Sequence, residues 1–156
     1  MLASLAGFTG FATPLELSRI GDASSSHDLI SVRVRNPSSA AGARAQHPEL
    51  PGDPHYGDPA EGCRFDEADT AVDNIPGDLC APSCTLFNPC PTDKPPGVAA
   101  HPECVLQDPT SQHEYCALVC SVTAPIVDQK AADEQCGTNA SCKTVQTGIG
   151  ICTYDD

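Results

Sequence analysis

The sequence predicts a small disulfide-rich domain with short β-strands and little helix, preceded by a long extended N-terminal arm. All ten cysteines lie between Cys63 and Cys152, and an even number at this density is typical of a disulfide framework in an oxidising compartment. Residues 63–156 contain only four aromatic side chains, so their core is thin and needs cross-links. Residues 1–62 contain no cysteine and little that could pack by itself.

We predict that the ten cysteines bond to one another rather than to a metal. Zinc and iron–sulfur sites favour two cysteines separated by two residues, because thiolates on a tight turn reach one ion. The sequence has no such pair, which also argues against a thioredoxin-like redox site. His101 and His113 each stand three positions before a cysteine, which is a weaker metal signal. The predicted disulfide cysteines are Cys63, Cys80, Cys84, Cys90, Cys104, Cys116, Cys120, Cys136, Cys142 and Cys152.

Two closely spaced cysteine pairs constrain the connectivity without determining it. In Cys80/Cys84 and in Cys116/Cys120, three residues separate the cysteines, so both thiols point to the same side of a helix or a strand. Parallel Cβ vectors suit two separate partners better than a bond within the pair. We therefore expect each pair to join its segment to two others, while the full connectivity stays open.

The chain divides into three predicted parts. Residues 1–35 form an N-terminal arm, residues 36–62 a linker rich in proline and glycine, and residues 63–156 the cystine-stabilised domain. The linker composition predicts an extended segment with no packed face. Residues 18–46 are rich in Ser, Ala and Arg, a composition typical of transit peptides. The first 62 residues are therefore either a cleaved presequence or a retained docking segment.

One segment of the arm has the alternation of a half-buried strand. The apolar residues at positions 30, 32 and 34 fall on one face, and the polar residues at 31, 33 and 35 on the other. This strand can add to the chain's own sheet or to the edge of a partner's sheet. As a docking segment it would contact the partner through Ile30, Val32, Arg33, Val34 and Arg35.

Regular structure in the cystine domain is expected to be short, because proline and glycine recur along it. Residues 115–122 are the most apolar run and predict the central strand. Residues 128–135 predict a short helix, and residues 142–146 and 149–154 predict a hairpin across Thr147 and Gly148. The acid-rich stretch at residues 64–78 predicts a solvated loop rather than a calcium site, because its acids are irregularly spaced.

The chain is strongly acidic, and its charge is unevenly distributed along the sequence. The chain has a net charge of −13, and residues 48–156 carry 18 acidic side chains against four basic ones. Such a surface repels nucleic acid and anionic lipid headgroups. Residues 1–17 are mildly apolar but too short, and too broken by glycine and proline, to span a bilayer as a helix. We expect protein partners, no nucleic acid and no transmembrane span, with a peripheral position on a membrane complex left open.

The sequence carries no catalytic signature. An enzyme needs a nucleophile with its base, paired carboxylates in a cleft, or a metal. His113 beside Glu114 and Cys116 is the nearest candidate, but an oxidised Cys116 cannot act as a nucleophile. We therefore predict a protein that is not an enzyme and that uses no cofactor. Asn139 begins the one usable glycosylation sequon and is the candidate glycosylation site.

Four pieces of the cystine domain carry a resemblance: Cys90–Asp93, Tyr115–Cys120, Cys136–Gly137 with Ser141–Cys142, and Gly150–Asp156. Through them, residues 80–156 resemble small cysteine-rich secreted or lumenal proteins of algae and related protists. The pieces are mostly cysteines and turn residues, so the resemblance implies a disulfide scaffold and brings no catalytic residues with it. Phe11–Pro14 also resembles the phenylalanine-headed junction of plastid presequences in algae with complex plastids.

These observations predict a non-enzymatic, disulfide-stabilised accessory or structural subunit of a larger assembly. The most specific setting they suggest is the thylakoid lumen, on the lumenal side of a photosynthetic membrane complex such as a photosystem with its antenna. The alternative is a free extracellular binding protein, such as an effector, an inhibitor or a receptor ligand. Residues 1–62 distinguish the two, because a free secreted protein would lose a presequence, whereas a subunit would keep and order it.

Overall fold

Short strands make up most of the regular structure. The computed structural model describes residues 28–35, 53–122 and 128–155. The predicted class, a small disulfide-rich domain with short strands and little helix, is confirmed, whereas residues 1–27 of the predicted arm lie outside the described residues. The elements in chain order are β1 (Ile30–Val34), β2 (Glu67–Val72), β3 (Asp78–Cys84), β4 (His101–Gln107), β5 (Glu114–Ser121), α1 (Gln129–Asp133), β6 (Ala140–Gln146) and β7 (Ile149–Tyr154).

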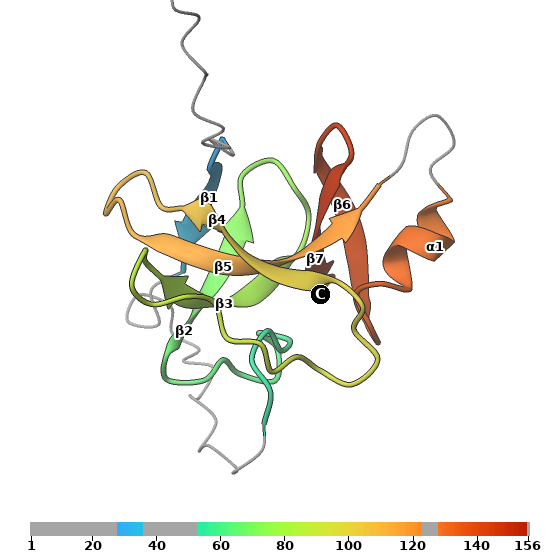
Figure 1. Cartoon of the computed structure of the whole chain (residues 1–156), viewed down its shortest axis with the longest axis horizontal. Coiled ribbons are helices and arrows are strands. Elements are labelled where there is room, and N and C mark those ends of the chain that lie inside the picture. Colours follow the sequence, from blue (N-terminus) through green and yellow to red (C-terminus); the bar gives the residue numbers. More distant parts are fainter. Residues whose placement is uncertain (1–27, 36–52, 123–127, 156) are drawn as a thin grey trace, which may run out of the picture.

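Five of these strands close on themselves into a ring (Figure 1). Neighbouring strands follow the order β1–β2–β3–β5–β4, and β4 then pairs with β1. All pairings in the ring are antiparallel except that of β1 with β4, which is parallel. Closure removes the exposed strand edges that an open sheet of this size would present to other chains.

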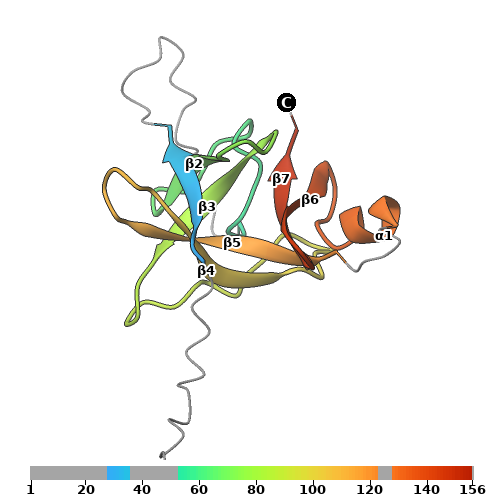
Figure 2. The ribbon, with the colours of Figure 1, turned by 90° about the horizontal axis from the view of Figure 1, so that it is seen from above.

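The hairpin of β6 and β7 extends the ring on one side. β7 pairs with β5, and it also meets β3 where Tyr154 pairs with Asp78. Helix α1 begins after Asp128, whose side chain accepts a hydrogen bond from the Ala131 N–H, and it lies against β6. In both ribbon views α1 lies away from β1 and β2 (Figures 1 and 2). The predicted helix and hairpin are both confirmed.

β5 is the centre of the core, as its apolar sequence predicts. Its alternate residues face two different clusters, because successive side chains of a strand point to opposite faces. Cys116, Leu118 and Cys120 belong to a sulfur-rich cluster. Ala117 and Val119 belong to an aliphatic cluster with residues of β1, β2, β3, β4 and β7. The thin core is therefore built from cystines on one face of β5 and aliphatic side chains on the other.

All ten cysteines form disulfides, and none is free. Each of the two closely spaced pairs is bonded to two separate segments, as their geometry predicts. Closing loops of this length contributes about 3 kcal/mol per bond in the chain-entropy model, without simple additivity. The bonds are Cys63–Cys80, Cys84–Cys104, Cys90–Cys116, Cys120–Cys142 and Cys136–Cys152.

β1 lies in the chain's own sheet, which corrects the interpretation of residues 30–35 as a partner-docking strand. Val32 is fully buried in the aliphatic cluster. Arg33 pairs with Asp73 at 2.8 Å, and Arg35 pairs with the buried carboxylate of Asp78 at 2.5 Å. A strand on the same chain competes at a high effective concentration for the space between β2 and β4. The residues concerned are Ile30, Val32, Arg33, Val34 and Arg35.

The folded body begins before the predicted boundary at Cys63. Residues 53–62, which we call the strap, are predicted as part of an extended linker with no packed face. In the structure Tyr56 is 1% exposed and His55 is 8% exposed. The structure differs from the prediction at residues 53–62, because one buried aromatic residue is enough to anchor a segment whose end is tied down by the Cys63–Cys80 disulfide. Residues 36–52 of the predicted linker lie outside the described residues.

The acid-rich stretch at residues 64–78 is not the predicted solvated loop. It contains β2, which pairs with β1 and β3. Thr70 and Val72 are buried, whereas the acidic residues that flank them, Asp69 and Asp73, are half-buried. The alternation of apolar and polar residues that is typical of a strand is weak in β2, because Thr and Ala occupy positions where a larger apolar residue would have indicated a strand.

Candidate binding surface

Two large apolar side chains stand almost fully in solvent on one turn between β3 and β4. Leu86 is 92% exposed and Phe87 is 93% exposed. They are the central residues of a turn that is closed by two backbone hydrogen bonds between Thr85 and Asn88, at 3.0 and 3.1 Å. Adjacent exposed side chains of this size are typical of contact sites rather than of ordinary surface. We call residues 85–89 the apolar turn.

Polar side chains within the apolar turn satisfy its backbone. The hydroxyl oxygen of Thr85 accepts hydrogen bonds from the N–H groups of Phe87, at 3.2 Å, and Asn88, at 3.1 Å. Threonine in this position commonly stabilises a turn in this way. The polar groups are therefore turned inward onto the loop, while the two apolar side chains contact little of the rest of the chain.

Disulfides hold the apolar turn on both sides. Cys84, directly before the turn, is bonded to Cys104 in β4, and Cys90, directly after it, is bonded to Cys116 in β5. A segment cross-linked at both ends has few conformations to lose when it binds. The apolar turn is thus a pre-organised projection rather than a loop that must be ordered by its partner.

His55 attaches the strap to the rest of the molecule through two carboxylates. Its Nδ1 lies 2.8 Å from Asp93, and its Nε2 lies 3.0 Å from Asp66. Ionised carboxylates only accept hydrogen bonds, so the protonated imidazole, with two donors, is the form that satisfies both. Burial alone would lower the pKa of His55, but the bonds to Asp66 and Asp93 outweigh burial and raise the pKa above 6.5. Against the effect of burial, His55 also holds the pKa of both carboxyls below 3.8.

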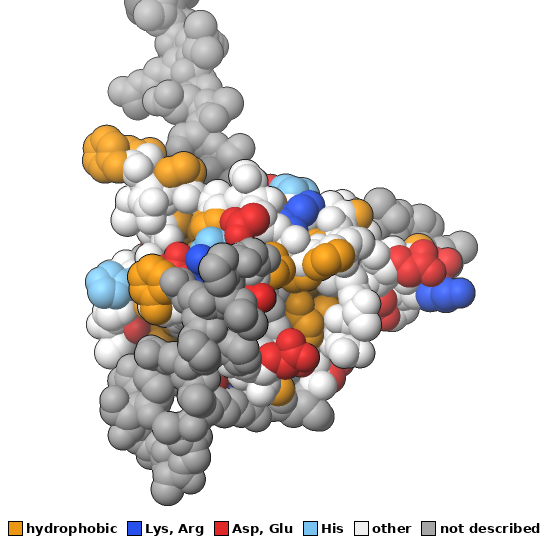
Figure 3. All heavy atoms as spheres, turned by 90° about the horizontal axis from the view of Figure 1, so that it is seen from below, with side chains coloured by type: hydrophobic (Ala, Val, Ile, Leu, Met, Phe, Trp, Pro, Cys, Tyr) orange, Lys and Arg blue, Asp and Glu red, His pale blue; other side chains and the backbone are white. Residues whose placement is uncertain are grey.

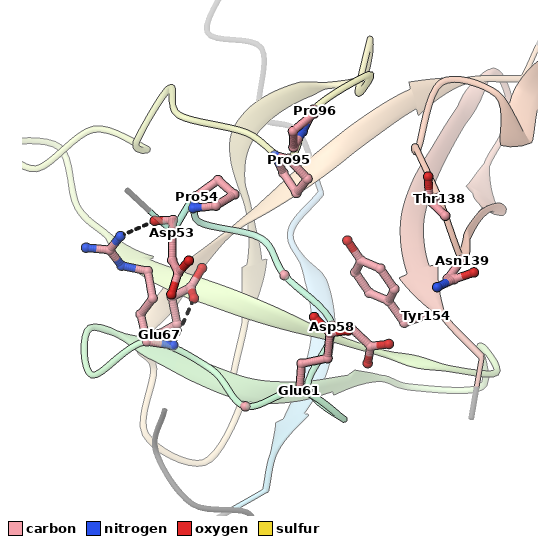
Figure 4. Close-up of a pocket in the computed structure, with 13 residues that line it drawn as sticks. Asp53, Pro54, Asp58, Glu61, Glu67, Pro95, Pro96, Thr138, Asn139 and Tyr154 are labelled. Carbon is pink, nitrogen blue, oxygen red and sulfur yellow. Dashed lines mark hydrogen bonds between the residues drawn. The ribbon is translucent and has the colours of Figure 1, made fainter. Parts of the chain in front are cut away.

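A hollow of about 490 Å³ lies between the strap, the loop before β4, and β7 (Figure 4). Figure 4 shows the rings of Pro54, Pro95 and Tyr154 around it, with the carboxylates of Asp58 and Glu61 below the tyrosine. Its walls are thus partly apolar and partly acidic. The lining residues are Asp53, Pro54, Gly57, Asp58, Glu61, Gly62, Arg64, Glu67, Pro95, Pro96, Thr138, Asn139 and Tyr154.

Two polar side chains of the hollow are engaged in holding the strap. Glu67 accepts hydrogen bonds from the N–H groups of Tyr56, at 2.6 Å, and Arg64, at 3.1 Å, and burial raises its pKa against those bonds. The Tyr154 hydroxyl donates to the Tyr56 carbonyl at 3.0 Å. Burial, with nearby carboxylates, raises the pKa of Tyr154 to about 12. Their chemistry is therefore explained by packing of the strap, and it identifies no ligand.

The structure does not assemble a catalytic group from the residues singled out in the sequence. His113 is exposed in the loop before β5, and Glu114 is half-buried beside it. Cys116 is buried and bonded to Cys90, so its sulfur is not a nucleophile. Cys120, Cys136 and Cys152 have sulfurs within 4.8 Å of one another, but all three belong to disulfides packed side by side.

Asn139 lies where an attached glycan would meet solvent. The residue is exposed at the turn that precedes β6, and its backbone φ of 63° is one that asparagine tolerates better than most residues. It also lines the rim of the hollow. A glycan on Asn139 would therefore stand beside the strap.

The apolar turn is not among the features predicted from the sequence. A signal for it exists, because Leu86 and Phe87 are adjacent and lie between Cys84 and Cys90 in a segment rich in turn residues. Two adjacent side chains on a tight turn cannot both point into a thin core. Only the structure shows that neither of them does.

No family model matches the chain, and no curated protein and no solved structure matches it either. The class of protein is defined by the structure itself: a disulfide-stabilised ring of short strands with a hairpin and one short helix. Its five disulfides indicate an oxidising environment, such as a secreted or lumenal one. Among residues 28–35, 53–122 and 128–155, no helix is both long and apolar enough to cross a membrane.

Proposed function

We propose that this protein is a non-enzymatic binding protein that acts as an accessory or structural subunit of a larger assembly, with the apolar turn as its main contact. The observation that carries the proposal is the exposure of Leu86 and Phe87 on a turn held by two disulfides. Leaving such side chains in water is unfavourable. An aromatic anchor on a rigid support is the kind of residue that dominates protein interfaces.

The proposed setting is the lumenal side of a photosynthetic membrane complex, such as a photosystem with its antenna. Support comes from the disulfides, from the transit-peptide composition of residues 18–46, and from the resemblance of residues 80–156 to lumenal proteins of algae. β1 has no part in this proposal, because its apolar face is buried in the chain's own ring.

The proposal is tested by replacing Leu86 and Phe87 together with serine. The disulfides and the ring do not depend on these exposed side chains, so the variant should fold and melt like the wild type. It should no longer migrate with the assembly on native gels of gently solubilised membranes from the cells that make the protein. The matched control is Phe65→Ser, because Phe65 is 70% exposed but lies outside the apolar turn.

Two outcomes would contradict the proposal. Normal comigration of the double variant would show that the apolar turn is not the contact. Recovery of the wild-type protein free in the medium, with none in membrane complexes, would show that it is a free secreted binding protein rather than a subunit of an assembly.

A further inference from the structure

We infer that the apolar turn binds an apolar pocket on another protein whose rim carries lysine and arginine side chains. The inference rests on the proposed function and adds the chemistry of the partner. It follows from the shape of the apolar turn together with the charge of the surface around it.

The shape of the apolar turn requires a concave partner. Leu86 and Phe87 are the two central residues of a tight turn and are each more than nine-tenths exposed. Two adjacent anchors on so narrow a projection can be buried together only if the other surface surrounds them. A pocket surrounds both side chains, whereas a flat surface would cover only one side of each side chain.

Among the described residues, four basic side chains pair with carboxylates of the same chain. Arg33 pairs with Asp73 and Arg35 with Asp78, and Lys143 pairs with Asp155 at 3.0 Å. Arg64 lies 3.5 Å from Asp66. Lys94 donates to the neutral Ala100 carbonyl and keeps its charge, and Lys130 is exposed. Because residues 48–156 carry 18 acidic side chains against four basic ones, a partner that contacts this part of the chain meets mainly negative charge. Figure 3 shows one face on which acidic groups stand among hydrophobic ones and basic groups are few.

A carboxylate also lies at the base of the apolar turn. Glu114 is opposite Cys84 in the pairing of β3 with β5, and its carboxylate oxygen lies 3.7 Å from the Cys104 sulfur. The rim of any pocket that receives Leu86 and Phe87 therefore approaches this carboxylate. Complementary potentials across an interface favour a cationic rim at that point.

The same charge opposes two other occupants of the apolar turn. A second copy of the chain would bring another net charge of −13 to the contact. An anionic lipid surface would repel the acidic body, because such surfaces attract basic segments. Both occupants are nevertheless distinguished by the experiment below.

The experiment places a photo-cross-linker on the apolar turn of the full-length chain in the cells that make it. Phe87→p-benzoylphenylalanine is compared with Phe65→p-benzoylphenylalanine, and the cross-linked peptides are sequenced. We expect position 87 to link to one protein, within apolar residues flanked by Lys or Arg, at about five times the yield of position 65 or more. The yield should fall at least about threefold when salt is raised from about 50 mM to about 500 mM before irradiation, and Glu114→Gln should lower it at low salt.

Each of the other outcomes contradicts either the inference alone or the inference together with the proposed function. Cross-links to an uncharged or acidic pocket, with a yield independent of salt, overturn the inference and leave the proposed function standing. Equal yields at positions 87 and 65 overturn both. Dimers of the purified protein in sedimentation overturn the inference in favour of a second copy if Leu86→Ser with Phe87→Ser abolishes them. Flotation with vesicles of anionic lipid that the same double variant abolishes overturns the inference in favour of a membrane. We expect a monomer that does not float.

Discussion

His55 lies between two carboxylates that come from different parts of the chain, Asp66 and Asp93. Because the pKa of His55 is raised in the folded protein, its contribution to stability is complete below pH 6.5 and is lost as the pH rises through the folded pKa. The pKa values of the two carboxyls are lowered, so their contribution is present above pH 3.8 and is lost as the pH falls through their folded values. The attachment of the strap should therefore be strongest in mildly acidic solution.

We predict that His55→Gln removes the loss of stability that the wild type shows between mildly acidic and mildly alkaline pH. At about pH 6 the substitution should cost about 1–2 kcal/mol, because it leaves two carboxylates without their charged donor. The measurement is the free energy of unfolding in urea over this pH range. His113→Gln, at an exposed histidine, is the control and should follow the wild-type curve. A pH profile of His55→Gln that matches the wild type would contradict the assigned role.

Gly150 is required by the packing of a disulfide rather than by its backbone conformation. A Cβ at this position would lie 2.6 Å from the sulfur of Cys142 and 2.9 Å from that of Cys120, which are bonded to each other. Both sulfurs are fixed in the core, so the contact cannot be relieved by rotating a flexible side chain. The sequence suggests only that glycines near residue 148 serve the hairpin turn.

We expect Gly150→Ala to lower the free energy of unfolding by about 1–3 kcal/mol, the usual cost of overpacking a dense core. Gly57→Ala is the matched control, because a Cβ on Gly57 meets nothing within 4 Å, and it should change stability by less than about 0.5 kcal/mol. Urea denaturation of both variants under oxidising conditions makes the comparison. Equal stabilities would show that the disulfide can shift to make room.

At the scale of secondary-structure elements, β1 determines whether the ring is closed. Val32 pairs with Val72 in β2, and Ile30 pairs with Leu106 in β4. Without β1, the edges of β2 and β4 would be exposed and the buried carboxylate of Asp78 would lose Arg35. A presequence, if one is removed, must therefore end before β1 for the ring to stay closed.

We predict that deleting residues 1–27 leaves cooperative unfolding intact, whereas deleting residues 1–35 destabilises the protein by about 3 kcal/mol or more. Val32→Asp in the full chain should do the same, because it buries an unpaired charge. Arg33→Ala removes an exposed ion pair of the same strand and should leave the melting temperature close to that of the wild type. Thermal unfolding followed by circular dichroism distinguishes these cases. A wild-type melting temperature after deletion of residues 1–35 would show that β1 is dispensable.

At the scale of the whole molecule, the disulfides replace a large part of the missing core. Four of the five bonds connect the end of the strap to β3, β3 to β4, the end of the apolar turn to β5, and β5 to β6. The fifth bond connects the turn after α1 to β7. Cystine sulfurs also fill one face of β5 where a larger protein would use aromatic side chains. The disulfides therefore both join the segments of the fold and supply much of its stability.

We expect the intact mass to rise by ten hydrogens on full reduction, since every cysteine is bonded. Reductant at neutral pH should abolish the cooperative thermal transition, because each lost bond removes about 2–4 kcal/mol from a domain of marginal stability. Mass spectrometry and calorimetry with and without reductant make the two measurements. A smaller mass change, or an unchanged transition after complete reduction, would contradict the dependence on cross-links.

The sequence by itself determined the features that depend on local spacing. The cysteine pattern predicts a disulfide framework and the separate partners of both closely spaced pairs, because the side-chain direction of neighbouring residues is set by the backbone. The apolar run of β5, the helix after Asp128 and the hairpin across Gly148 follow in the same way from period, capping and turn residues.

The tertiary structure alone decided which surfaces are buried and which are left free. The alternation of β1 is equally suited to a partner's sheet, and only its pairing with Val72, 40 residues away, assigns it to the ring. Tyr56 anchors the strap and Phe87 does not anchor its turn, although both stand among turn residues in the sequence. The difference lies in contacts between segments far apart in the chain. Local sequence does not encode such contacts, because burial depends on what the rest of the fold leaves uncovered.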